Sequence, residues 1–262
     1  MSAIITSIYN CPVKSISFQN IDKCKINKKI GIEGDRVFAF SQNLDLDQSK
    51  EFEKNPEARK GKWNKIVTLK NTPVFNKYNF LYENNKLTLT IKDKEIITIN
   101  INDSNERDNL VNKLIELEGS LKNDIRLMKN DEQPFYDTSI SNKSIFRNSI
   151  SLLNVNSIKD FENKIDQKIE KSIFRGNLYF DGIEAWEERN WIGKTIKIND
   201  VLFKVEKNIP RCVAINLKPK TDDNSFNLLK TLKQTYDHYD MGVYLTPEND
   251  GEINLSEKIL IK

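Results

Sequence analysis

The chain has 262 residues and carries 41 Lys+Arg against 38 Asp+Glu, a formal net charge of +3. Charges so nearly balanced create no global field toward nucleic acid or an anionic membrane, so neither is expected as a partner. Three cysteines without paired spacing and a single histidine exclude a tetrahedral Cys/His zinc site, argue against a disulfide framework and favour a reducing cytoplasm.

The chain begins with an apolar stretch that predicts a strand over residues 3–13. Cys11 and Pro12 should end it in an extended turn, because proline disfavours helix at the residue before it. Lys14 and Ser15 follow directly. We therefore expect both side chains at the end of a strand.

A second strand is expected over 21–26, and glycine turn chemistry over 31–36 leads into a third strand over 37–40. Arg36 consequently stands at a strand entrance. The polar, charge-dense segment 45–62 is interpreted as a solvated loop and is assigned no chemistry.

A hairpin and a helix follow. Residues 86–91 and 95–100 alternate with period two across a short polar turn, which indicates a β-hairpin. Asp103 and Glu106 form a capping-box pattern ahead of leucines at helical spacing over 110–121. These leucines are interpreted as core residues.

The polar segment 123–144, which contains Pro134, is the best candidate for a domain junction. It divides the chain into two predicted domains, 1–122 and 123–262. Both are long enough to bury a core of their own.

Beyond the junction, a short strand is expected over 150–153 and a helix over 158–169, capped by Asn156 or Ser157. The strand-to-helix turn at Asn154 exposes amide donors that suit an anion, although ordinary capping is the favoured interpretation.

The stretch 173–182 predicts a strand on which Arg175 and Asn177, two residues apart, share one face. The remaining elements are a hairpin over 195–198 and 201–205, a helix over 226–236, and closing strands over 241–244 and 259–261. The fold class is therefore mainly β with several short helices, of the α+β type.

Cys212 stands beside Arg211 and directly after Pro210. A neighbouring positive charge favours the thiolate, the form of cysteine that ligates a soft metal. For an isolated cysteine a buried structural role is still the favoured interpretation. His238 has no visible Ser or Asp arrangement around it, so a local contact with Asp237 or Asp240 is expected in place of a triad.

Cationic and amide groups recur at distant strand ends, and together with one soft thiol they suit an anionic cofactor that bears a thiophilic metal. In order and spacing the chain resembles the MOSC proteins that have an N-terminal MOSC β-barrel domain. The matching pieces are Tyr9-Asn10-Cys11-Pro12-Val13-Lys14-Ser15, Gly31-Ile32-Glu33-Gly34-Asp35-Arg36, Phe174-Arg175-Gly176-Asn177, Asp181-Gly182, Trp186 to Trp191, Gly193, Pro210-Arg211-Cys212 and Gly242-Val243-Tyr244.

The resemblance implies a β-barrel type fold of two closely packed domains, with 1–122 as the MOSC N-terminal domain, 123–262 as the MOSC domain and the cofactor between them. It implies that Cys212 is catalytic and ligates the metal of a molybdenum-molybdopterin cofactor. The implied pterin- and phosphate-binding residues are Lys14, Ser15, Arg36, Arg175, Asn177 and Arg211.

The activity implied by the resemblance is the reduction of N-hydroxylated small molecules by a molybdenum-dependent oxidoreductase. The chain lacks the clustered cysteines of an iron-sulfur domain that some relatives carry. Electrons would therefore come from a separate protein of the ferredoxin, flavoprotein or cytochrome type.

Two departures from the family pattern stand out. Many members have proline between the arginine and the asparagine, where this chain has Gly176, so the loop is expected to be less rigid. Ser256 and Glu257 replace a usual Gly-Asp near the C-terminus, which is interpreted as drift in a surface turn.

Two alternatives to the reductase remain. A module that carries molybdopterin, or sulfur on Cys212, without turnover of its own would use the same residues. A β-barrel that binds nucleic acid is disfavoured, because the aromatic residues are not interleaved with Lys and Arg as in single-strand binders.

Overall fold

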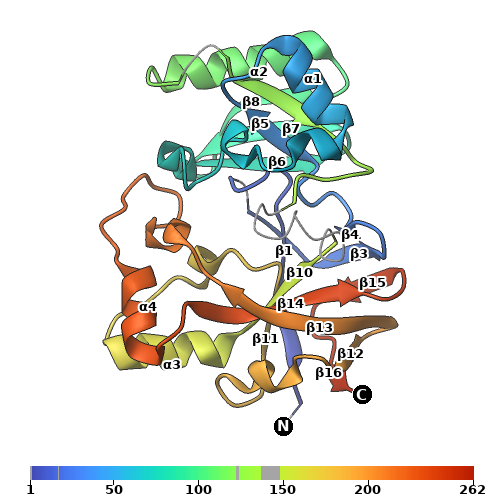
Figure 1. The fold of residues 1–262 in the computed structure, drawn as a ribbon, viewed down its shortest axis with the longest axis vertical. Coiled ribbons are helices and arrows are strands. Elements are labelled where there is room, and N and C mark those ends of the chain that lie inside the picture. The colour runs from blue at the N-terminus through green and yellow to red at the C-terminus, as the bar shows by residue number, and fades with distance from the viewer. Residues whose placement is uncertain (1, 17, 122–123, 137–147) are drawn as a thin grey trace. The chain divides into compact units, whose positions relative to one another are not determined.

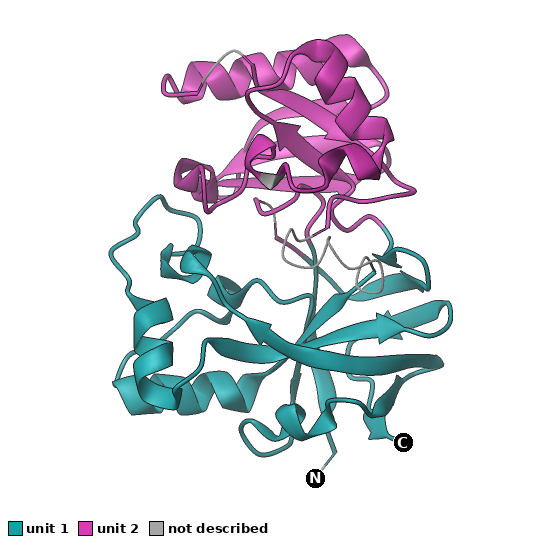
Figure 2. Cartoon of the chain, in the orientation of Figure 1, with its two compact units in different colours: residues 1–10, 20–33, 145–262 teal, residues 11–19, 34–144 magenta. Residues whose placement is uncertain are grey.

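The computed structural model describes residues 2–16, 18–121, 124–136 and 148–262. The chain forms two compact units (Figure 2): unit 1 comprises Met1–Asn10, Asn20–Glu33 and Ile145–Lys262, and unit 2 comprises Cys11–Gln19 and Gly34–Ser144. Neither unit is one continuous stretch, so the compact units divide the chain differently from the consecutive domains 1–122 and 123–262. The physical reason is strand pairing, since early strands complete the sheets of unit 1.

Unit 1 is built on one curled eight-stranded sheet (Figure 1) with the order β16-β12-β13-β14-β10-β11-β1-β2, and on a three-stranded sheet with the order β15-β3-β4. The strands are β1 (Ile4–Asn10), β2 (Gln19–Ile21), β3 (Lys23–Asn27), β4 (Gly31–Ile32), β10 (Ile150–Asn154), β11 (Leu178–Asp181), β12 (Thr195–Ile198), β13 (Val201–Pro210), β14 (Asp240–Pro247), β15 (Gly251–Asn254) and β16 (Ile259–Ile261). β10 and β11 run parallel, whereas β1 and β14 run antiparallel to their partners. The mainly β fold class is confirmed.

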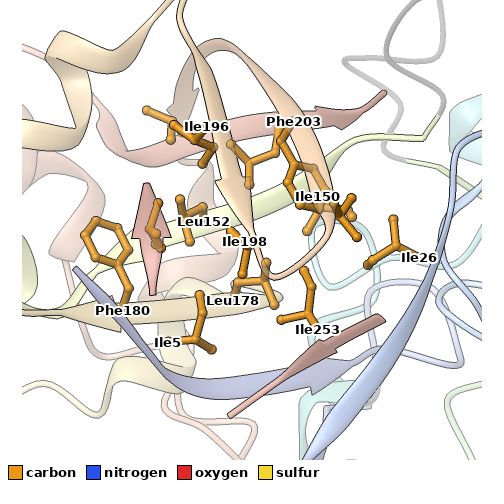
Figure 3. Packing of buried hydrophobic residues seen from close by; sticks show 14 of the residues in the cluster. Ile5, Ile26, Ile150, Leu152, Leu178, Phe180, Ile196, Ile198, Phe203 and Ile253 are labelled. Carbon is orange, nitrogen blue, oxygen red and sulfur yellow. The ribbon is translucent and has the colours of Figure 1, made fainter. Parts of the chain in front are cut away.

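The two faces of the sheet bury different apolar clusters. Leu152, Leu178 and Phe180 belong to the cluster drawn in Figure 3, while their chain neighbours Leu153 and Tyr179 belong to a second cluster. The alternation follows from the period of two along a strand. Both faces of β10 and β11 are therefore covered, so these buried strands fix the positions of the segments that follow them in the chain.

The second cluster is closed by helices (Figure 1). The α-helices of unit 1 are α3 (Val155–Ile165) and α4 (Leu228–Tyr236), and its 3-10 turns are η5 (Lys171–Phe174), η6 (Glu187–Trp191) and η7 (Val213–Asn216). Ile158 and Phe161 of α3 and Leu228 and Leu232 of α4 are buried in this cluster. Amphipathic spacing thus places both helices on the sheet.

The start of α3 differs from the prediction by several residues. Asn154 is the cap, and its side chain accepts a hydrogen bond from Asn156 N–H (3.0 Å). Fully buried Glu188 accepts from the Ser157 hydroxyl (2.8 Å) and from the Asn154 amide (3.1 Å). The chain's own Glu188 carboxyl group therefore occupies the space near this helix start, and the capping interpretation is confirmed.

Unit 2 contains a two-stranded sheet of β5 and β9 and a three-stranded sheet of β6, β7 and β8. Its elements are β5 (Phe38–Ser41), α1 (Leu46–Lys54), η1 (Pro56–Arg59), η2 (Trp63–Lys65), η3 (Pro73–Lys77), β6 (Tyr78–Glu83), β7 (Lys86–Ile91), β8 (Lys94–Asn100), α2 (Ser104–Leu117) and β9 (Arg126–Lys129). Lys92 and Asp93 both have positive φ between β7 and β8, as a tight hairpin turn requires. The predicted hairpin is confirmed.

The interpretation of 45–62 as a loop is wrong, because this segment contains α1 and η1. Asp45 and Gln48 form a reciprocal capping box at the start of α1, and Phe52 anchors the helix in a core with Leu44. The prediction for α2 needs a smaller correction. Asp103 caps the helix, but Glu106 turns back to Asn100 N–H, and the helix ends at Leu117.

Across the described residues, the structure contains no helix with both the length and the apolar character needed to cross a membrane.

Candidate functional site

Cys212 lies directly beyond β13, the longest strand of unit 1. Pro210 is the last strand residue, and Arg211 N–H still pairs with Tyr239 O (2.8 Å) at the start of β14. Cys212 then caps η7, with its carbonyl accepting from Ile215 N–H (3.1 Å). Its thiol is reduced and exposed. The favoured composition-based interpretation of a buried thiol is therefore wrong, and the sulfur is accessible on a firmly held backbone.

The Arg211 side chain ties three segments together beside Cys212. Its Nη1 donates to Phe174 O (2.7 Å), and Nε and Nη2 both donate to Met241 O, with Nε at 3.0 Å. These bonds join the end of β13 to the end of η5 and to β14. A planar guanidinium suits such a fork better than a lysine would.

The structure does not place Arg175 and Asn177 on one face of a strand as predicted, because β11 begins only at Leu178. Arg175 ends η5 in the left-handed region (φ 52°, ψ 44°), with its N–H on Ser172 O (2.9 Å). Its side chain is half-buried. Since Arg211 reaches Phe174 O, the two arginines are carried by directly bonded segments.

Asn177 is buried and connects three strands of unit 1. Its Oδ1 accepts from the Ser151 hydroxyl (2.8 Å), its N–H donates to the same hydroxyl (2.8 Å), and its carbonyl accepts from Tyr9 N–H (2.7 Å). These contacts fix the start of β11 between β10 and β1. They show Asn177 shaping the loop that carries Arg175.

The other predicted residues are brought together in unit 2. Residues 11–14 run beside 36–38, because Arg36 N–H donates to Cys11 O (2.7 Å) and Lys14 N–H donates to Phe38 O (2.8 Å). Lys14 is buried and Ser15 is half-buried with a positive φ of 64°. The structure therefore gathers Lys14, Ser15 and Arg36 in one turn region.

Arg36 is held as a cation in this turn. Its Nε donates to Asp35 Oδ2 (2.5 Å), and the other oxygen of Asp35 accepts from Cys11 N–H (2.8 Å). The guanidinium lies 5.7 Å from the centre of the Tyr136 ring. Burial lowers the pKa of Arg36, but the Asp35 carboxylate together with Cys11 and Tyr136 more than offsets this, so the pKa of Arg36 is raised above its ordinary value.

Asn10, which lies in a matching motif, and Asn208, which stands two residues before another, each have an unsatisfied acceptor that the sequence did not single out. The side-chain oxygens of Asn10 and Asn208 are buried and have no hydrogen-bond partner within the described part of the chain. Buried polar atoms are normally paired, because an unpaired one costs about 1–3 kcal/mol. Proximity in sequence to Lys14 and Cys212 is the only signal that could have pointed to them.

His238 belongs to a local cluster. Its Nδ1 accepts from Asp240 N–H (3.1 Å), and its ring stacks on Tyr236 with centres 5.7 Å apart. Burial lowers the pKa of His238, with help from the nearby Arg189 charge. The expected local contact with Asp240 is confirmed.

One family model, two curated proteins and several solved structures are similar to this chain. The MOSC domain family model matches residues 137–259. Mitochondrial amidoxime reducing component 2 of Rattus norvegicus is 33% identical over 72 residues, which is 28% of this chain and 21% of that protein. Molybdenum cofactor sulfurase of Drosophila yakuba is 29% identical over 111 residues, 40% of this chain and 14% of that protein. The chain therefore matches less than a quarter of the length of either relative.

Two solved structures are also similar. The YuaD protein from Bacillus subtilis aligns over 100% of this chain and 96% of its own, with a TM-score of 0.45 and 10% identity. YiiM from Geobacillus stearothermophilus covers 43% of this chain and 53% of its own, with a TM-score of 0.35 and 16% identity. The family match is the specific finding among these: the MOSC domain model covers residues 137–259, which is somewhat under half of the chain.

Proposed function

We propose that this protein binds a molybdenum-molybdopterin cofactor and reduces N-hydroxylated small molecules with electrons from a separate redox protein. The single observation that carries the proposal is Cys212: an exposed, reduced thiol on a rigid strand end, inside a MOSC domain. The relatives named for amidoxime reduction and for cofactor sulfuration support the class of cofactor.

The residues present fit such a group. Its phosphate and pterin need cations and hydrogen-bond partners, and its metal favours a soft thiolate. The chain offers the Cys212 thiol, the guanidinium groups of Arg36 and Arg175, and the Lys14 ammonium group. The unpaired oxygens of Asn10 and Asn208 are acceptors that suit the N–H groups of a pterin.

Each residue has a distinct part in the proposal. Cys212 ligates the metal through sulfur, while Lys14, Ser15, Arg36 and Arg175 bind the pterin and its phosphate. Arg211 and Asn177 add to this set by fixing the segments on which Cys212 and Arg175 stand.

When bound, the cofactor supplies two-electron redox chemistry at molybdenum, which no side chain of the protein can replace. In the overall reaction the N–O bond of the substrate breaks, two electrons and two protons are taken up, and the products are the N–H compound and water. The electron donor is a ferredoxin, flavoprotein or cytochrome type protein. The chain's own contribution is to hold Cys212 exposed and immobile.

The proposal is tested with protein purified from cells that make the cofactor, given a chemical reductant and an amidoxime. The wild type should form the amidine, and Cys212→Ala should reduce turnover to background, because the metal loses its protein ligand. Cys24→Ala is the matched control, since Cys24 is buried in the core of unit 1, and it should retain activity. Full turnover by Cys212→Ala would contradict the assignment of Cys212 as the metal ligand.

A sulfur or molybdopterin carrier without turnover is the second candidate. It is favoured by the similarity to a cofactor sulfurase and by the accessibility of the Cys212 thiol. Mass spectrometry separates the two, because a carrier should show Cys212 with one additional sulfur atom, whereas a metal-ligating cysteine should not.

A further inference from the structure

Tyr179 is completely buried on β11, and its hydroxyl closes the loop that precedes this strand. The hydroxyl donates to Lys171 O (2.9 Å) and accepts from Gly176 N–H (3.0 Å). Lys171 begins η5, and Gly176 directly follows Arg175. One phenol therefore joins both ends of the segment 171–176.

The segment 171–176 holds the backbone of Arg175 in the left-handed region, which is unfavourable without stabilising contacts. A left-handed backbone is sparsely populated by residues other than glycine, yet Arg175 has φ 52° and ψ 44°. The bond from its own N–H to Ser172 O lies inside the same segment. Release of the hydroxyl would free Arg175 to adopt commoner conformations.

The absence of a side chain at Gly176 lets its backbone lie close to the Tyr179 ring. A Cβ atom at Gly176 would lie 2.2 Å from Leu153 Cδ1 and 3.2 Å from Tyr179 Cζ, so a side chain there would force Leu153 to shift and would press on the phenol. Proline, which the family pattern leads one to expect at this position, also has no N–H to donate to the hydroxyl. The restraint that a proline would supply is thus replaced here by a hydrogen bond.

The phenol ring is itself held firmly. Tyr9 packs against it edge-on with ring centres 5.6 Å apart, and Lys171 Nζ lies 5.3 Å from its centre. Burial raises the pKa of Tyr179, and the nearby Arg211 and Arg175 charges only partly oppose the shift. The hydroxyl therefore keeps its proton and donates to Lys171 O throughout the neutral range.

We propose that Tyr179 is a positioning residue, whose hydroxyl clamps the segment 171–176 and thereby presents the Arg175 guanidinium for anion binding. The clamp is a property of the chain itself, while the identity of the anion, the cofactor phosphate, rests on the proposed function.

The first arm of the test measures the clamp without any cofactor. Hydrogen–deuterium exchange of peptides covering 171–177 should be about tenfold faster in Tyr179→Phe than in the wild type, because two buried hydrogen bonds are lost. Tyr78→Phe is the matched control: Tyr78 is a buried phenol of unit 2 that donates to Glu118 Oε1 (2.5 Å). It should leave exchange in 171–177 unchanged.

The second arm is a double-mutant cycle on pterin loss during dialysis of the purified holoprotein. Arg175→Met should speed pterin loss severalfold in the wild-type background and less than about twofold in the Tyr179→Phe background, because the two changes remove one function. In the Tyr78→Phe background the effect of Arg175→Met should be undiminished. General destabilisation by Tyr179→Phe would not produce this coupling.

Unchanged exchange in Tyr179→Phe overturns the clamp, and additive effects in the cycle overturn the positioning of Arg175. If the wild type carries no pterin, the proposed function fails while the exchange arm still decides the clamp. The two failures are therefore distinguishable.

Discussion

At the scale of single residues, Arg211 stabilises the folded chain through the planar shape of its guanidinium group as well as through its charge. Its fork reaches Phe174 O and Met241 O, so Arg211→Lys keeps the charge but cannot make all three hydrogen bonds. We expect the free energy of unfolding to fall by about 1–3 kcal/mol, because hydrogen bonds to charged donors are lost in a partly buried place. Urea unfolding followed by tryptophan fluorescence measures the change.

Arg189→Lys is the comparison for this prediction. Arg189 makes a partly exposed ion pair with Asp240 at 3.4 Å, and such pairs contribute less than about 1 kcal/mol. If the two lysine variants lose the same stability, the fork of Arg211 has no special role.

At the scale of elements, the loop before β11 depends on the absence of a side chain at Gly176. Gly176→Ala places a methyl group 2.2 Å from Leu153 Cδ1, and overpacking of this kind costs about 1–3 kcal/mol of unfolding free energy. Gly119→Ala is the control, since a Cβ there would meet no atom within 4 Å among the described residues. Equal melting temperatures for the two variants would show that Leu153 yields freely.

The start of α3 makes a prediction about pH. Burial raises the pKa of Glu188 above its ordinary value of 4.5, although Ser157 and Asn154 partly oppose the shift. The folded state therefore holds this proton to a higher pH than the unfolded chain, and the resulting stability is present below pH 4.5 and lost as the pH rises. The unfolding free energy of the wild type relative to Glu188→Gln should thus decrease from about pH 4 to pH 7.

The unfolding free energies of the wild type and of Glu188→Gln are compared at each pH, so that the contribution of the other carboxylates cancels. A difference that increases with pH over this range would contradict a raised pKa for Glu188.

Elements with strong periodicity were predictable from the sequence, and those set by tertiary contacts were not. The hairpin of β7 and β8 follows from alternation alone. In contrast, α1 has few apolar residues, and its visible signal was the Asp45 and Gln48 capping pair. The left-handed turn at Arg175 depends on Tyr179, a contact that no local pattern shows.

At the scale of the whole molecule, the order of motifs along the chain did not show how the chain divides into compact units. Lys14 and Arg36 meet in unit 2, and Arg175 and Arg211 are joined in unit 1. Composition could not show that residues 1–10 and 20–33 belong with the C-terminal half, because this assignment depends on strand pairs such as β1 with β11 and β3 with β15. The exposure of Cys212 was equally invisible in the sequence.

Cofactor content is the most direct test of the proposed binding of a molybdenum-pterin cofactor by Cys212, Arg36 and Arg175. Molybdenum and pterin are measured per chain in protein purified from cells that make the cofactor. We expect near-equal amounts of both in the wild type, molybdenum lost in Cys212→Ala, and pterin reduced severalfold in Arg36→Met and Arg175→Met. A wild type that carries neither molybdenum nor pterin, or a Cys212→Ala variant with undiminished molybdenum, would contradict the proposed binding.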